Sequence, residues 1–152
     1  MFRVGIIGPE STGKSTLAKY LAHRYNGVLI AEYAREYMES LPVDYDYTYD
    51  DVLHIAQHQI EELDTLDSNL LIFDTELIVT KVWFLHKFGS CPNVVLESLQ
   101  RNRMDVYLLC YPDMPWVADP VRENPDIREY LFEWYEREIQ ALGVPYYIIR
   151  HE

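Results

Sequence analysis

The segment at residues 8–16, GPESTGKST, has the residue types and spacing with the clearest chemistry in the chain. It contains the pattern G-x-x-x-x-G-K-S between a short apolar run and an amphipathic stretch. Glycines let the backbone fold tightly and point N–H groups at phosphate oxygens, and a following helix N-terminus adds partial positive charge. The segment therefore predicts a site for a phosphate chain, with the lysine at the outer phosphates. The residues assigned to this site are Gly8, Glu10, Ser11, Thr12, Gly13, Lys14, Ser15 and Thr16.

Two positions predict a magnesium ion beside those phosphates. Ser15 offers a hydroxyl, and Asp74 ends an apolar run, a usual position for a carboxylate that holds magnesium near a nucleotide. The alternative is that Asp74 caps the helix that follows. Glu76, two residues later, either faces the same cavity and binds substrate or caps that helix.

A second group of candidates follows the next apolar run. Glu32 stands where this run meets a predicted helix, so its carboxylate could accept the proton of an attacking hydroxyl or hold a ribose. The alternative is a helix N-terminal glutamate stabilised by the helix dipole. Tyr33, Arg35 and Glu36 share that helix as substrate-binding candidates, the alternative being an exposed helix face. Gln59 is a substrate-binding candidate or an ordinary exposed glutamine.

The segment PWVADPVR, after the fourth apolar run, predicts a lid over the site. Its Arg122, together with Arg128 six residues on, would neutralise charge on a transferring phosphate. The alternative is a surface loop whose arginines pair weakly with nearby carboxylates. Trp116 and Asp119 in the same segment are substrate-binding candidates.

Two other features point to no site. His54 and His58 lie four apart on a predicted helix, a spacing that permits metal ligation, but no third ligand is evident and we do not predict zinc. The tyrosine- and aspartate-rich segment 43–51 is expected to be a solvated acidic loop or a helix entry.

The elements that must position these residues follow from the hydrophobic pattern. Short, continuously apolar runs at 3–7, 28–31, 69–74, 106–110 and 146–149 predict strands. Helical spacing predicts helices at 14–25, 32–41, 52–66, 76–88, 93–102 and 126–142. Apolar strands that alternate with helices indicate a parallel sheet covered on both faces. Such sheets bind ligands at the carboxyl ends of their strands, where the candidates above gather.

The composition of the chain argues against some classes of binding partner. The chain has 152 residues and a net charge of −12, which argues against nucleic acid or an anionic membrane as the main partner because both require a basic surface. No apolar run approaches a membrane span, the N-terminus lacks signal-peptide features, and the two cysteines, Cys91 and Cys110, are expected to be reduced. We therefore expect a single cytoplasmic domain over 1–152, compatible with a homo-oligomer.

The chain resembles the NadR-like P-loop kinases, related to the ribosylnicotinamide kinase domain of the bifunctional NAD-biosynthesis regulator. GPESTGKST, EYAREY, IAQHQIEE, IFDTELIVTKVW and PWVADPVR occur in the family order, and the PDIREYLFEWY helix extends the match. The resemblance implies a P-loop NTPase fold of the nucleoside- and nucleotide-kinase type, an α/β architecture with a parallel five-stranded sheet and a lid after the fourth strand. It implies ATP- and magnesium-dependent phosphoryl transfer to the ribose hydroxyl of nicotinamide riboside, giving nicotinamide mononucleotide. The catalytic residues would be Lys14, Glu32, Asp74, Arg122 and Arg128.

The aromatic and acidic bias agrees with such an acceptor. Thirteen tyrosines and three tryptophans accompany the negative charge, and the pyridinium cation of nicotinamide riboside favours aromatic faces and carboxylates. Two alternatives remain open: a kinase for another nucleoside or nucleotide, and a nucleotide-binding regulatory ATPase or GTPase module. The base-recognition sequence N-K-x-D of many GTP switches is absent, which weakens the second alternative.

Overall fold

The computed structural model describes residues 1–10, 12–113 and 127–150. Five strands lie in these ranges: β1 (Phe2–Ile7), β2 (Val28–Ile30), β3 (Leu70–Asp74), β4 (Val106–Cys110) and β5 (Tyr146–Ile149). The helices are α1 (Lys14–Arg24), α2 (Tyr33–Glu39), α3 (Tyr49–Thr65), α4 (Leu77–Phe88), α5 (Asn93–Arg101) and α6 (Arg128–Leu142). None of these helices has the length and apolar character needed to cross a membrane.

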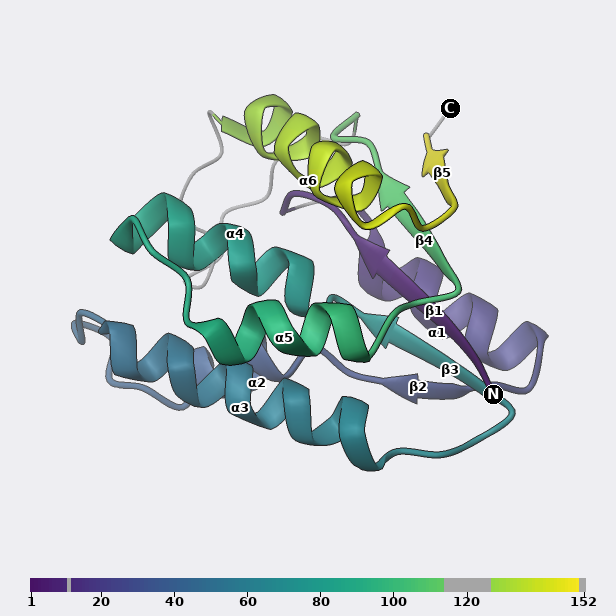
Figure 1. Ribbon diagram of the computed structural model, residues 1–152, viewed down its shortest axis with the longest axis horizontal. Helices are drawn as coiled ribbons and strands as arrows, with labels where there is room; N and C mark the ends of the chain where they lie inside the picture. Colours follow the sequence, from purple (N-terminus) through teal and green to yellow (C-terminus); the bar gives the residue numbers. More distant parts are fainter. Residues whose placement is uncertain (11, 114–126, 151–152) are drawn as a thin grey trace.

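The strands form one parallel sheet in the order β2-β3-β1-β4-β5, which confirms the predicted five-stranded parallel sheet (Figure 1). The register aligns Ile6 of β1 with Asp74 of β3, and Ile7 of β1 with Leu109 of β4. The carboxyl ends of the three central strands therefore meet at one edge. The order reverses at β1, so the loop after β1 opens at the point where α/β sheets bind ligands.

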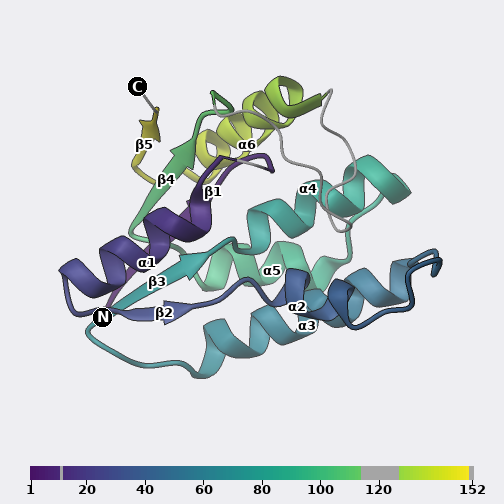
Figure 2. The same ribbon diagram turned by 180° about the vertical axis from the view of Figure 1, so that it is seen from behind.

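Helices cover both faces of the sheet, as predicted, but unequally (Figures 1 and 2). On one face α1 packs through Ala18 against Val4, Ile6 and Ile72. On the other face α3, α4, α5 and α6 bury a larger core with the opposite side chains of the strands. Because β1, β3 and β4 are apolar toward both layers, they are held rigidly, and the loops at their carboxyl ends inherit fixed positions.

The tyrosine- and aspartate-rich segment 43–51 is a helix entry, one of its two predicted forms, and most of its residues are exposed, but Asp51 at its end is buried. Asp51 is only 8% exposed, and its carboxylate accepts hydrogen bonds from the hydroxyls of Tyr37 (2.6 Å) and Tyr45 (2.8 Å). Thr48 and Asp51 also form a capping box, so α3 begins at Tyr49 rather than near Val52. These bonds tie α2 to the start of α3 and fix the segment between them.

The predicted lid lies outside the described residues. Trp116, Asp119 and Arg122 fall in 114–126, and the phosphate-site candidate Ser11 is likewise not described. Asp126, the predicted first residue of the last helix, also falls in that range, and α6 begins at Arg128.

Candidate active site

The loop between β1 and α1 has the backbone geometry expected of a phosphate-binding loop. A Cβ atom on Gly8 would lie 2.7 Å from the carbonyl oxygen of Cys110, so only glycine fits where the loop crosses the end of β4. Gly13 is the N-cap of α1 with φ of 80°, in the left-handed region that favours glycine. The first turn of α1 has no acidic residue, and its leading N–H groups have no partner within the helix, which suits an anion.

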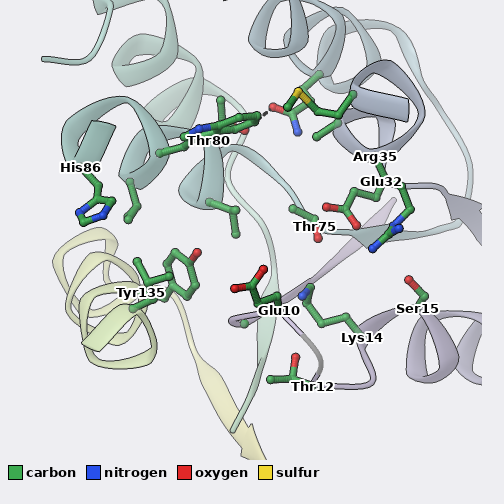
Figure 3. A pocket seen from close by; sticks show the side chains of 18 of the residues that line it. Glu10, Thr12, Lys14, Ser15, Glu32, Arg35, Thr75, Thr80, His86 and Tyr135 are labelled. Carbon is green, nitrogen blue, oxygen red and sulfur yellow. Dashed lines mark hydrogen bonds between the residues drawn. The ribbon is translucent and has the colours of Figure 1, made fainter. Parts of the chain in front are cut away.

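Lys14 is held along this loop. Its Nζ donates a hydrogen bond to the carbonyl oxygen of Pro9 at 3.0 Å, and the Thr12 hydroxyl donates to the same oxygen at 2.8 Å. In Figure 3 the Lys14 side chain extends from the loop toward Glu10 and the open space above it. The ammonium group therefore lies at the loop itself, where it can reach the outer phosphates of a bound chain.

Ser15 and Asp74 meet as predicted for a magnesium site. The Ser15 hydroxyl donates to Oδ2 of Asp74 at 2.7 Å. Asp74 is 6% exposed, and its other oxygen, Oδ1, is buried and has no hydrogen-bond partner in the described ranges 1–10, 12–113 and 127–150. A buried carboxylate oxygen is costly without a partner, and a hydroxyl next to a carboxylate supplies the hard oxygen ligands that magnesium prefers. The two residues fit a magnesium ion.

A cavity of about 570 Å³ opens from the loop toward α3, α4 and α6, within the size range of small-molecule sites (Figure 3). Ten of the residues predicted to bind ligand line it: Gly8, Glu10, Thr12, Gly13, Lys14, Ser15, Thr16, Glu32, Arg35 and Gln59. The phosphate loop and the candidate acceptor residues therefore share one continuous space.

Glu32 lies on the wall of this cavity facing the loop. It is the N-cap residue of α2, but its side chain makes no capping hydrogen bond. Figure 3 shows Glu32 and Thr75 on the side of the cavity opposite Lys14 and Glu10. Its carboxylate also lies beside the N-terminus of α2, where the helix dipole favours it, so the role of Glu32 toward a hydroxyl or a ribose remains a prediction. Arg35, on the next turn, also lines the cavity and bonds Glu39 through Nη1 at 3.2 Å.

Three described residues predicted to bind substrate, Tyr33, Glu36 and Glu76, lie outside the cavity lining. Glu36 is exposed on the outer side of α2. The ring of Tyr33 stacks on His58 with centroids 3.6 Å apart, and its hydroxyl lies 2.9 Å from Nε2 of His54. Both histidines are thus occupied by a tyrosine, and the described residues contain no group of three or more metal-binding side chains.

Glu76 caps α4, which was the alternative to a place in the cavity. Its carboxylate accepts a hydrogen bond from the N–H of Ile78 at 2.8 Å and caps α4, with the residue 2% exposed beneath the cavity wall. Glu76 does not line the cavity. Burial raises the pKa of this carboxyl to about 7, opposed by hydrogen bonds from Ile78 and Tyr107. The sequence places a glutamate here, but only the fold reveals that it is buried.

This burial predicts a pH-dependent stability. The folded-state pKa of Glu76 is about 7, against 4.5 normally, so the folded protein retains a proton that the unfolded chain has lost. Stability contributed by Glu76 therefore falls as the pH rises from about 4.5 to 7. We expect Glu76→Gln to match the wild-type melting temperature at pH 5 and to exceed it by several degrees at pH 8. A difference between the two proteins that does not grow with pH would contradict this.

Arg128 reaches the phosphate loop from α6. Its Nη1 donates to the carbonyl oxygen of Glu10 at 3.4 Å, although Arg128 is outside the cavity lining. The contact places the guanidinium beside the loop rather than far out on the surface. Its predicted role toward a transferring phosphate remains a prediction.

Aromatic residues that the sequence did not single out form the far wall of the cavity. Trp83 donates from Nε1 to the hydroxyl of Tyr47 at 2.9 Å, and their rings meet edge to face with centroids 5.4 Å apart. Tyr135 of α6 is 5% exposed, and burial, reinforced by Glu10 and Glu32, raises its pKa. Trp83 ends the matched segment IFDTELIVTKVW, which was the available signal, whereas Tyr47 lay in the segment predicted as a solvated loop.

A buried pair orients Gln59 on the same wall. The Thr80 hydroxyl donates to Oε1 of Gln59 at 2.6 Å, and both residues are almost fully buried while lining the cavity. With its oxygen taken by Thr80, the amide presents its NH2 group as a donor. Gln59 is therefore not an ordinary exposed glutamine, which was the alternative to its substrate-binding role.

The fold and the loop together define a P-loop protein of the nucleoside- and nucleotide-kinase type. The AAA domain family matches residues 3–152, and the chain belongs to this family. The predicted similarity to NadR is also confirmed. The trifunctional NAD biosynthesis/regulator protein NadR of Escherichia coli (strain K12) is 30% identical over 126 residues, covering 78% of this chain and 30% of that protein.

Solved structures agree with this placement. A crystal structure of NadR in complex with NR superposes with a TM-score of 0.79 at 25% identity, covering 99% of this chain and 44% of that chain. Thymidylate kinase from Ehrlichia chaffeensis shares the fold, with a TM-score of 0.66 at 14% identity over 99% of this chain and 87% of that one. The chain spans less than half the length of the NadR proteins it matches.

Proposed function

We propose that the protein transfers the γ-phosphoryl group of ATP, with magnesium, to the ribose hydroxyl of a nucleoside-like acceptor, and that the acceptor is nicotinamide riboside. The observation that carries this proposal is the single cavity that joins the phosphate loop to an aromatic wall bearing Glu32 and Gln59. A protein that only bound or hydrolysed nucleotide would not require the part of the cavity beyond the phosphate loop. Phosphoryl transfer requires both parts to meet at the transferred group.

Different residues of the chain would bind the phosphates, bind magnesium and accept the proton. Lys14 and the N-terminus of α1 hold the outer phosphates, and Ser15 and Asp74 would hold magnesium. Magnesium, when bound, neutralises charge on the phosphates. The acceptor oxygen attacks the γ-phosphorus, the bond to the β–γ bridging oxygen breaks, and ADP leaves with that electron pair. Glu32 accepts the proton of the attacking hydroxyl.

The aromatic far wall of the cavity supports a cationic acceptor. Tyr47, Trp83 and Tyr135 offer aromatic surface, and the carboxylates of Glu10 and Glu32 act electrostatically on Tyr135. A pyridinium cation is favoured by both features. The similarity to NadR, which has been crystallised with NR, supports the same acceptor. The wall also carries Arg35 and Lys87, so a phosphorylated acceptor belongs in the test.

A panel of acceptors tests this assignment. Wild-type protein with magnesium and ATP would be assayed by mass spectrometry for phosphorylated nicotinamide riboside, adenosine, cytidine, thymidine and thymidylate. We expect the highest kcat/KM for nicotinamide riboside. A higher value for any other member would replace this acceptor while keeping the kinase. Transfer to none of them, with nucleotide-dependent binding of a partner protein, would favour the regulatory module instead.

The Gln59–Thr80 pair gives a separate prediction for the acceptor side. Thr80→Val keeps the shape of the side chain but removes the hydroxyl that fixes Gln59, so the amide loses its orientation. We expect the KM for the acceptor to rise about tenfold, the effect of one lost hydrogen bond, with nucleotide affinity unchanged. Thr80→Ser, which retains the hydroxyl, serves as the control and should stay near wild type. Equal acceptor KM values for the valine and serine variants would contradict this role.

A further inference from the structure

Thr75 has a backbone conformation that threonine rarely adopts. Its φ is 72°, in the left-handed region, where a β-branched side chain is strained. Among the described residues one other non-glycine has positive φ, Asn26 at 54°, and asparagine tolerates this region far better. Glycine would adopt the same conformation without strain. The threonine is therefore retained at a cost in stability.

The surrounding contacts impose that conformation. The N–H of Thr75 donates to the carbonyl oxygen of Ile6 at 2.8 Å, which fixes the end of β3 against β1. The next residue, Glu76, is buried as the cap of α4. Held at both ends, the chain turns sharply at Thr75 and directs its side chain to the cavity wall, opposite Lys14 in Figure 3.

Among the residues that the structure describes, the Thr75 hydroxyl has no hydrogen-bond partner. Its Oγ1 is buried without a hydrogen bond, and the residue is 8% exposed although it lines the cavity. An unpaired buried hydroxyl adds a second cost to the backbone strain. The neighbouring Oδ1 of Asp74 is unpaired as well. Two consecutive residues thus carry unsatisfied buried oxygens: Thr75 lines the cavity, and Asp74 is bonded to Ser15, which also lines it.

The carboxylates near Thr75 indicate which part of a bound ligand its hydroxyl would contact. Glu32 and Asp74, when ionised, are carboxylates that only accept hydrogen bonds, so they suit the acceptor's hydroxyl proton and a cation. The oxygens of a transferring phosphoryl group require donors instead, and a threonine hydroxyl is a neutral donor. We propose that Thr75 Oγ1 donates a hydrogen bond to an oxygen of the transferring phosphoryl group. This inference rests on the proposed phosphoryl transfer.

Three variants separate the hydroxyl from the backbone. Thr75→Ser keeps the hydroxyl, Thr75→Val keeps the branched shape and the strain, and Thr75→Gly relieves the strain and removes the hydroxyl. We expect the serine variant to keep kcat within about threefold of wild type, and the valine and glycine variants to lose about tenfold or more at unchanged ADP affinity. The melting temperature of the glycine variant should equal or exceed that of wild type.

An acceptor-independent readout keeps this test apart from the identity of the acceptor. ADP, magnesium and fluoroaluminate mimic the transferring group, and trapping of ADP would be measured for each variant. Trapping by wild type and serine but not by valine or glycine supports the proposal. Equal trapping by all four, or equal loss in the serine and valine variants, overturns it. If wild type traps ADP but transfers phosphate to no acceptor, the proposed function is wrong. If wild type does not trap ADP, both the proposed function and the role of Thr75 are wrong.

Discussion

Lys14→Ala is expected to lower affinity for ATP by about a hundredfold or more and to abolish phosphoryl transfer, because its ammonium is the charged side chain held along the phosphate loop. The side chain is attached to the loop through the Pro9 carbonyl, so truncation removes the charge and leaves the glycine backbone and the α1 N-terminus in place. Titration of a fluorescent ATP analogue measures the loss. Unchanged nucleotide affinity would contradict the assignment of the loop.

Lys19→Ala provides the matched control for this result. Lys19 is an exposed lysine on the same helix and lies outside the cavity lining. Its removal lowers the net charge of the protein by the same amount, so a general electrostatic effect would appear in both variants. We expect nucleotide affinity in this control to remain within about twofold of wild type, since distant exposed charges are screened by salt.

The second large effect is expected at Asp74. Asp74→Asn preserves the size of the side chain and an oxygen for the Ser15 hydroxyl, but it removes the negative charge and the unpaired Oδ1. We expect kcat to fall by about a thousandfold because charge neutralisation at the transferring phosphate is the main source of catalysis in such enzymes. Turnover measured across a magnesium titration gives the result.

The control for this variant is Asp67→Asn, an exposed aspartate before β3. It should retain wild-type turnover and wild-type magnesium dependence. The fold of Asp74→Asn should remain intact, because replacing a buried, unpaired carboxylate oxygen removes a desolvation cost. An Asp74→Asn protein that turns over normally and still responds to magnesium would remove Asp74 from the metal site.

The strands and the phosphate loop were predictable because their signals are local. Each central strand is a continuous apolar run, and the pattern between Gly8 and Ser15 fixes a loop whose backbone geometry depends on its own glycines. The parallel arrangement followed from the alternation of strands and helices, whereas the order β2-β3-β1-β4-β5 was not predicted from the sequence. Asp74 and Glu32 became candidates because the strand ends of such a sheet meet at one edge.

The remaining part of the site depends on contacts between segments far apart in the chain. Periodicity indicated that Tyr33 and Tyr135 each lie on a helix face, but not that His58 would cover the first while the second would line the cavity. Asp51 was read as solvated because its tyrosine partners are recognised only once α2 packs on α3. The positive φ of Thr75 arises from restraints on the residues before and after it, so no sequence pattern predicts this conformation.

The central claim is that the cavity brings an acceptor to the phosphate loop, and the rate of ADP formation from magnesium and ATP tests it most directly. The measurement compares wild-type protein with and without nicotinamide riboside, with the phosphorylated riboside quantified in parallel. The account predicts that the acceptor raises the rate at least about tenfold, with one phosphorylated riboside formed for each ADP. The same slow rate with and without every acceptor, from protein that still binds ATP, would contradict it.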